Sequence, residues 1–121
     1  MIEPARKKVT FLGGSANQIR SFPEAAKKDA GFQLDKVQQG LDPDDWEPMT
    51  TVGPGCKEIR VWEDDGTYRV LYVAKFPEAV YVLNAFKKTT QKTPHANIDA
   101  AKAAYAQIPK PKPKATGKAK K

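Results

Sequence analysis

The sequence contains few of the residues on which several kinds of site depend. Its 121 residues include one cysteine, Cys56, and one histidine, His95. A single cysteine excludes a disulfide within the chain and is typical of a protein of the reducing cytosol. There is no Cys-x-x-Cys motif, no histidine pair for a metal, no glycine-rich phosphate loop and no nucleophile elbow. We therefore expect neither a metal nor another cofactor.

Long hydrophobic stretches are also missing. No segment approaches the roughly 20 apolar residues of a membrane span. The first residues, MIEPARKKVTFLGG, lack the apolar run of a signal peptide. These absences favour a soluble cytoplasmic protein with no membrane partner, and the length suits one domain with a modest core.

Positive charge is concentrated at the end of the chain. The net charge is +7 at pH 7, and residues 110–121 hold six lysines and no acid. Residues 1–109 are therefore nearly neutral and form the expected domain, while residues 110–121 have the composition of a disordered lysine-rich tail. The tail either adds non-specific attraction to RNA or DNA or serves only solubility.

Residues 57–92 predict three consecutive strands. β-branched and aromatic residues cluster in short runs, which Asp64-Asp65-Gly66 and Phe76-Pro77-Glu78 interrupt. A two-residue turn at Asp65-Gly66 would pair Asp64 with Thr67. The resulting cross-strand pairs are Val61–Val70 and Ile59–Tyr72 on an apolar face, and Trp62–Arg69 and Arg60–Leu71 on the other. A three-residue loop would scramble these two faces, so burial favours the two-residue turn.

The rest of the chain predicts a strand and helices around this sheet. Residues 8–12 resemble a short strand, and a helical segment follows a capping box at Ser21. Gly31 leaves one helix or a helical hairpin as alternatives. Its expected apolar stripe is Phe22, Ala26, Ala30, Leu34, Val37 and Leu41. Residues 42–55 predict a solvated acidic loop with Trp46 as a packing anchor, and Asn97 is expected to cap a helix over residues 97–108.

Cationic chemistry is what the remaining polar residues support. Arg60 and Arg69 are expected beside Trp62 on one sheet face, and residues 87–93 hold three lysines and no acid. Such groups suit phosphate binding and stabilise the extra charge of a phosphorane-like transition state. RNA supplies its own nucleophile, the 2′-hydroxyl, so its cleavage needs in-line positioning and a proton acceptor. A lysine whose pKa is lowered by other cations would suit that role. The alternative is a pair of solvated arginines.

Five segments together resemble a known family. They are RSFPEAAKKDAGFQLDKVQQGL, WEPM, VGPGCKEIRV, GTYRVLYVAKF and AVYVLNAFKKTTQKTP. Over residues 8–108 the chain resembles the phage-associated HigB-like branch of the RelE/ParE toxins. The resemblance implies an α+β fold: a small, twisted, mainly antiparallel sheet with an N-terminal helical layer and a C-terminal helix. It also implies a toxin of a type II toxin–antitoxin pair, with two partners: an antitoxin, usually a helix-turn-helix DNA-binding protein, and the ribosome with its mRNA.

The resemblance also implies roles for individual residues. Arg60, Arg69, Lys87 and Lys88 would be catalytic, binding the phosphate, stabilising the transition state and supplying the base. Lys75, Phe86, Lys92 and Trp62 would contact RNA, although Phe86 could equally complete the core. Relatives often have histidine at the position of Asn84, and asparagine cannot transfer a proton near neutral pH. His95 or a lysine would then replace it, or the protein is slow or inactive; the plainer interpretation of His95 is an exposed loop residue.

Three functions follow from this sequence. The first is a ribosome-dependent mRNA endoribonuclease that inhibits translation, which the sheet arginines and the lysine segment favour. The second is a ParE-like gyrase inhibitor on the same fold. The third is a non-catalytic nucleic-acid-binding protein, a degenerate toxin that depends on its lysine tail.

Overall fold

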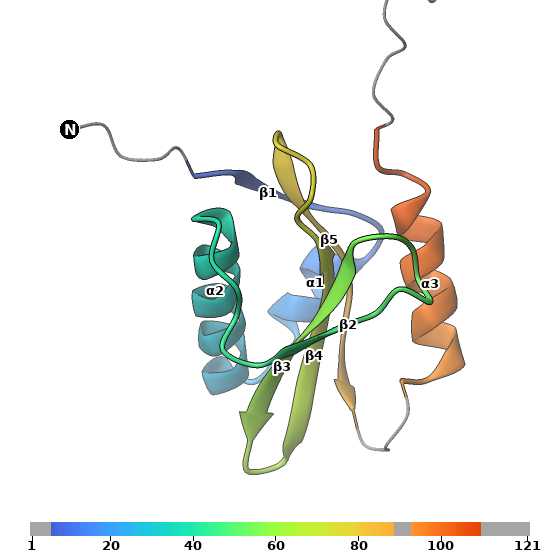
Figure 1. Cartoon of the computed structure of the whole chain (residues 1–121). Helices are drawn as coiled ribbons and strands as arrows, with labels where there is room; N and C mark the ends of the chain where they lie inside the picture. Colours follow the sequence, from blue (N-terminus) through green and yellow to red (C-terminus); the bar gives the residue numbers. More distant parts are fainter. Residues whose placement is uncertain (1–5, 89–92, 110–121) are drawn as a thin grey trace, which may run out of the picture.

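The computed structural model describes residues 6–88 and 93–109. A five-stranded mixed sheet with strand order β1-β5-β4-β3-β2 forms its centre. Helix α2 covers one face, α3 lies against the other, and α1 lies beside β5 (Figure 1). The bounds are β1 (Lys8–Phe11), α1 (Ser15–Arg20), α2 (Glu24–Gln38), β2 (Trp46–Pro48), β3 (Cys56–Glu63), β4 (Gly66–Val73), β5 (Ala79–Lys88) and α3 (His95–Tyr105). This confirms the α+β architecture expected from the sequence.

Three of the strands are those predicted from residues 57–92. β3, β4 and β5 pair antiparallel in chain order, β2 adds antiparallel to β3, and β1 adds parallel to β5. Leu83 is the extra residue of an irregularity between β4 and β5, because Leu71 pairs with Asn84 and Tyr72 pairs with Val82. The irregularity turns both Leu83 and Asn84 toward the α3 side.

The register of the β3–β4 hairpin differs from the predicted one. Glu63 pairs with Gly66, so the two turn residues are Asp64 and Asp65. The carboxylate of Asp65 accepts hydrogen bonds from the Tyr68 hydroxyl (2.8 Å) and from Lys87 Nζ (3.2 Å), which stabilise the turn at this position. Every side chain keeps its predicted face, because the β4 partner of each β3 residue shifts by two residues and side chains alternate between the faces. The cross-strand partners change, however: Arg60 lies directly opposite Arg69, Val61 opposite Tyr68, and Ile59 opposite Val70.

The N-terminal helical layer also differs in detail. One continuous helix, α2, runs through Gly31, but it begins at Glu24 with Pro23 at the N-cap and without a side-chain cap. The predicted capping box at Ser21 is wrong, because the Ser21 hydroxyl donates to the Asn17 carbonyl (3.0 Å) of α1. Helix α1 was not predicted. The apolar stripe of α2 is buried as expected except at Leu41, which lies beyond the helix and is 53% exposed.

Two further elements depart from the sequence prediction. The expected loop of residues 42–55 contains β2, which pairs with β3 between Trp46 and Ile59. Helix α3 begins at His95, with Pro94 at its N-cap, so Asn97 lies inside the helix and does not cap it. The side-chain amide of Asn97 instead donates to Asn84 Oδ1 (2.8 Å) and ties α3 to β5.

The sheet separates two hydrophobic cores. The α2-side core is formed by Phe22, Ala26, Ala30, Leu34, Val37, Ile59, Val61, Tyr68, Val70, Tyr72, Val80, Val82 and Ala85. The α3-side core is formed by Val52, Cys56, Leu71, Val73, Ala79, Tyr81, Leu83, Phe86, Ala101, Ala104 and Ile108. On the α3 side, the half of the sheet nearer the β3–β4 turn carries polar and charged side chains in place of a core. Among the described residues, no helix is long and apolar enough to cross a membrane.

Candidate functional site

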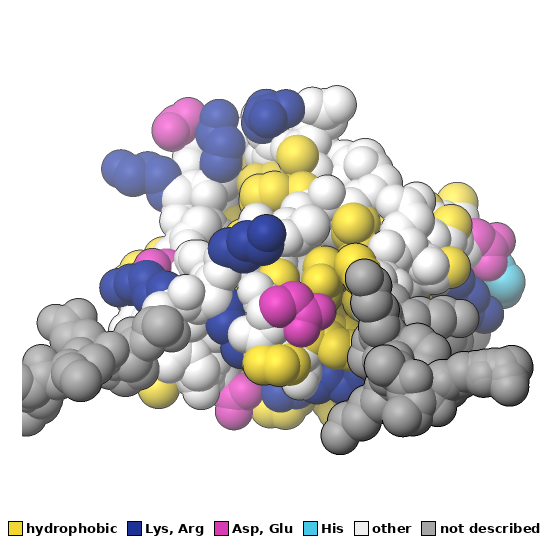
Figure 2. Space-filling view, turned by 90° about the horizontal axis from the view of Figure 1, so that it is seen from above, with side chains coloured by type: hydrophobic (Ala, Val, Ile, Leu, Met, Phe, Trp, Pro, Cys, Tyr) yellow, Lys and Arg dark blue, Asp and Glu magenta, His cyan; other side chains and the backbone are white. Residues whose placement is uncertain are grey.

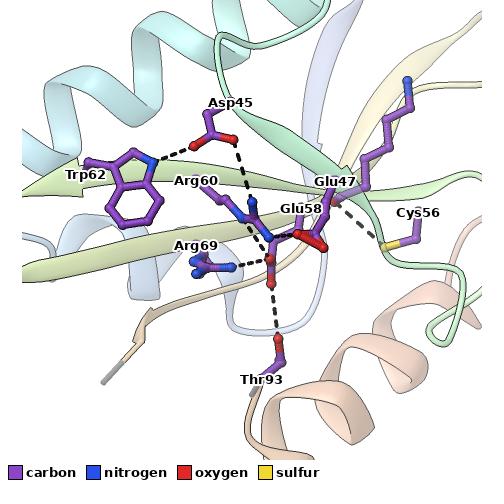
Figure 3. A network of polar contacts seen from close by, with 9 residues as sticks. Asp45, Glu47, Cys56, Glu58, Arg60, Trp62, Arg69 and Thr93 are labelled. Atoms are coloured by element: carbon purple, nitrogen blue, oxygen red, sulfur yellow. Dashed lines mark hydrogen bonds and ion pairs between the residues drawn. The ribbon is translucent and has the colours of Figure 1, made fainter. Parts of the chain in front are cut away.

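A charged cluster occupies the polar half of the α3-side face. Alternation along β3 places Glu58, Arg60 and Trp62 on this face, and the register brings Arg69 of β4 beside Arg60. Thr93, just before α3, approaches from the side (Figure 3). The structure therefore brings together the two arginines that the sequence predicted as phosphate ligands.

Glu58 lies at the centre of this cluster. Its side chain is 1% exposed, and its Oε1 forms an ion pair with Arg69 Nη1 and lies 3.8 Å from Arg60 Nε. Its Oε2 accepts a hydrogen bond from the Thr93 hydroxyl (3.2 Å). A buried carboxylate between two guanidinium groups fixes both of them, because leaving any of the three charges unpaired in this place is costly. Glu58 therefore positions the arginines.

The two arginines differ in access and in hydrogen bonding. Arg69 is 7% exposed, whereas Arg60 is less buried and faces the edge strand β2. The Nε of each arginine is buried and has no hydrogen-bond partner among the described residues. Arg60 is therefore the more accessible guanidinium, and Arg69 is the more deeply buried one.

Strand β2 and the residue before it place two acids over this cluster. Glu47 forms an ion pair with Arg60, and Asp45 lies 3.8 Å from Arg60 and accepts a hydrogen bond from Trp62 Nε1. Trp62 is nevertheless 61% exposed. The sequence predicted a solvated acidic loop here, but these partly exposed acids have specific partners. The neighbouring Asp44 also has partners on α2, and its hydrogen bonds with Lys36 and then Gln33 lower its pKa.

Lys88, at the end of β5, faces the same cluster. Burial lowers its pKa, and the positive charges of Arg69 and Arg60 lower it further, while Glu58 opposes them. Sequence reasoning asked for a lysine with a lowered pKa among other cations, and Lys88 has that environment. Cys56 does not offer a thiolate nucleophile, because burial and then Glu58 raise the pKa of its thiol to about 12.

Phe86 and Asn84, two further predicted site residues on β5, are buried and make contacts within the fold. Phe86 is 9% exposed and belongs to the α3-side core, which favours core completion over stacking on a base. Asn84 is buried and accepts the hydrogen bond from Asn97 of α3. Asn84, for which the resemblance implied a histidine in relatives, therefore forms a contact between the sheet and α3.

Three other predicted site residues do not join the cluster. Lys87 points to the opposite face, with its Nζ 3.2 Å from Asp65 and 5.9 Å from the Tyr68 ring centre. Lys75 follows β4, about 20 Å along the strand direction from Arg69. His95 begins α3 with a 92% exposed side chain, 3.8 Å from Asp99. A fourth predicted site residue, Lys92, lies outside the described residues.

Sequence reasoning missed the carboxylates of the site and Thr93. Glu58 shares the alternation that identified Arg60 and Trp62, so the pattern Glu-x-Arg-x-Trp was a usable signal. Asp45 and Glu47 had no comparable signal, because their placement depends on the pairing of β2. In the part of the chain that the structure describes, no group of three or more acidic, histidine or cysteine side chains is arranged to hold a metal ion.

The fold and the site define a class: a small α+β domain whose mixed sheet presents an arginine–carboxylate cluster beside its C-terminal helix. A family model described as Phage derived protein Gp49-like (DUF891) matches residues 17–106. The chain therefore belongs to this phage-derived family, which falls within the context of RelE/HigB-like toxins. A search of curated proteins found no match.

Proposed function

We propose that this protein is the toxin of a type II toxin–antitoxin pair and acts as a ribosome-dependent mRNA endoribonuclease. One observation supports this most strongly: Arg60, Arg69 and Lys88 converge on one sheet face, where burial and the arginines lower the pKa of Lys88. Membership of the phage-derived Gp49-like family is consistent with a toxin.

The chemistry that suits these groups is transesterification by the RNA itself. The neutral amine of Lys88 accepts the proton of a 2′-hydroxyl, whose oxygen then attacks the adjacent phosphorus. The bond to the 5′-oxygen of the next nucleotide breaks, that oxygen takes up a proton, and a 2′,3′-cyclic phosphate remains. Arg60, with Arg69 behind it, stabilises the extra negative charge of the transition state. Trp62 offers an exposed ring on which a base can stack.

Binding of RNA requires a rearrangement at Arg60. The cluster contains three cations, Arg60, Arg69 and Lys88, and three carboxylates, Glu58, Asp45 and Glu47. A phosphate therefore has to replace Glu47 and Asp45 at Arg60. These two acids are partly exposed, so separating them from Arg60 costs far less than separating Glu58 from Arg69. In this proposal the ribosome supplies the positioned mRNA, and an antitoxin neutralises the protein.

Induced expression in a bacterial host tests the proposal. We compare growth and mapped mRNA 5′ ends for the wild type, Lys88→Gln and Lys87→Gln. The two variants remove the same charge from neighbouring residues of β5 on opposite faces. We expect growth arrest with new cuts in translated messages for the wild type and Lys87→Gln, and loss of both for Lys88→Gln.

Other results would contradict the proposal. Arrest with intact mRNA and DNA-damage signalling would indicate a gyrase inhibitor. Equal loss in both lysine variants would mean that the site is not on the α3-side face. Absence of arrest with the wild type would indicate a degenerate toxin, and Asn84→His would then test whether the missing histidine explains it.

A further inference from the structure

A pocket, separate from the charged cluster, lies at the end of the sheet away from the β3–β4 turn. It has a volume of about 320 Å³ and is formed by the C-terminal end of α2, the start of β3 and the end of β4. Figure 2 views the molecule from this end and shows Lys and Arg side chains standing around exposed hydrophobic ones. Lys75, which the sequence predicted as an RNA contact, lines this pocket.

The pocket combines an apolar floor with a cationic rim. Val37 and the almost completely buried Tyr72 contribute to its floor. Its charged lining consists of Lys7, Lys57, Lys75 and one acid, Asp42. Asp42 lies 3.3 Å from Lys57, so this single carboxylate is already paired and the rim keeps a positive excess.

The lysines of the rim are placed by the backbone around them. Lys7 Nζ donates to the Ala74 carbonyl (2.6 Å), which fixes it at the edge of the pocket. Gly55 has φ +80°, and a Cβ added there would lie 2.8 Å from Lys75 Cδ. The stem of Lys75 therefore lies flat on the glycine backbone, and a larger residue at position 55 would displace it. Lys57 is held over the Trp46 ring, with Nζ 4.3 Å from the ring centre.

We propose that this pocket binds an acidic segment of a partner protein that carries apolar side chains. Carboxylates of such a segment would meet the three lysines, and an apolar side chain would lie on the floor beside Leu41, which is 53% exposed. Nucleic acid fits less well. The described lining residues include no arginine for two-pronged phosphate contacts and no exposed aromatic ring for stacking. The apolar floor would find no complement on a phosphate backbone.

This inference is independent of the nuclease proposal, because its test measures binding and not cleavage. The probe is a short fluorescein-labelled peptide of Glu-Glu-Leu repeats, titrated with the full chain while anisotropy is recorded. The pocket variant is Lys57→Gln with Lys75→Gln. The matched control is Lys28→Gln with Lys102→Gln, which removes the same charge from exposed positions on α2 and α3. The tail is unchanged in both variants, so its attraction for the peptide cancels in the comparison.

We expect the pocket variant to bind the peptide about tenfold more weakly than the control variant, since two lysines of the rim can no longer pair with carboxylates of the peptide. A peptide with serine in place of leucine should bind the wild type more weakly than the Glu-Glu-Leu peptide does. The Glu-Glu-Leu peptide should bind the Leu41→Ser variant more weakly than it binds the wild type. Thermal unfolding of each variant checks that the fold is retained. Equal binding by the pocket and control variants, or by the serine and leucine peptides, would overturn the inference. So would tighter binding of single-stranded RNA that disappears in the pocket variant.

Discussion

Glu58 is the residue on which the geometry of the candidate site depends. It is the one fully buried acid of the cluster, and it contacts both Arg60 and Arg69. Glu58 holds the two arginines in one arrangement, and this buried ion pair stabilises the fold only when each partner remains in place. Removing the carboxylate would leave two guanidinium groups without their shared counter-charge.

Glu58→Gln should therefore destabilise the fold by about 3–5 kcal/mol, the usual cost of breaking a buried pair. Urea unfolding followed by circular dichroism measures this change. Glu63→Gln is the matched control, since Glu63 ends the same strand and is partly exposed. It should change stability by less than about 0.5 kcal/mol. Unfolding of both variants at the same urea concentration would contradict the positioning role of Glu58.

The lowered pKa of Lys88 leads to a prediction for the pH dependence of the proposed cleavage. A general base acts in its deprotonated form, so the rate should rise with pH and level off above the pKa of Lys88. Burial and the arginines lower that pKa from 10.5, so the plateau should begin below pH 10.5. Single-turnover cleavage of mRNA on purified ribosomes measures the profile. The rising limb should disappear in Lys88→Gln. A profile that is unchanged in shape in this variant would assign the base to another group.

At the scale of the elements, β2 covers the outer side of Arg60 in the candidate site. It is an edge strand of three residues, and it brings Asp45 and Glu47 to Arg60. The backbone N–H of Arg60 also donates to the Asp45 carbonyl (2.9 Å), so the strand and its acids are fixed together. Helix α2 holds the preceding residue, because Gln33 and Lys36 both bind the Asp44 side chain. In the proposed function, Asp45 and Glu47 thus occupy the place that the phosphate would take at Arg60.

Glu47→Gln should tighten the binding of single-stranded RNA, because Arg60 loses a competing carboxylate. The ion pair is partly exposed, so the gain should be modest, about three- to fivefold. Filter binding at two salt concentrations measures it, and the gain should shrink at the higher salt. Glu63→Gln removes the same charge from the neighbouring strand, where Glu63 is not among the described ion-pair partners of Arg60. An equal gain in this control would indicate a general charge effect and not release of Arg60.

Elements with a strong local pattern could be predicted from the sequence. The three strands β3–β5 and helix α2 are long enough for alternation and helical spacing to identify them. Helix α1 has only six residues, and it depends on tertiary contacts such as that of the Ser15 hydroxyl with the Val82 carbonyl (3.0 Å). Strand β2 is shorter still, with three residues, and it is a strand only because it pairs with β3.

The shared face of Arg60 and Arg69 could be predicted from the sequence, but their direct opposition could not. Arg60 and Arg69 share a face because side chains alternate along a strand, and that rule survives an error of turn position. Their direct opposition depends on the turn at Asp64 and Asp65, where the hydrogen bonds to Asp65 come from Tyr68 and from the distant Lys87. A turn prediction that uses only the residues of the turn cannot include the hydrogen bond from Lys87, which lies on β5.

At the scale of the whole molecule, positive charge is distributed over separate places. The candidate site is balanced by its own carboxylates, whereas the pocket lined by Lys7, Lys57 and Lys75 has three lysines against one acid. Tyr72 places the pocket on the α2 side of the sheet, whereas the cluster lies on the α3 side, so a partner bound at the pocket would leave the cluster open. Residues 110–121 hold six further lysines, which account for most of the net charge of +7.

Deleting residues 110–121 should separate non-specific attraction from the proposed toxicity. The affinity for single-stranded RNA should become less sensitive to salt. The slope of log K against log salt should become less steep by about 0.7 for each phosphate that the tail no longer neutralises. Growth arrest and mRNA cutting should persist, because Arg60, Arg69 and Lys88 lie within the remaining chain. The truncated and full-length chains should therefore differ in binding and agree in toxicity. If truncation instead abolishes arrest while the fold is retained, the lysine-rich segment is the functional part, and the protein is a nucleic-acid binder whose sheet arginines serve stability alone.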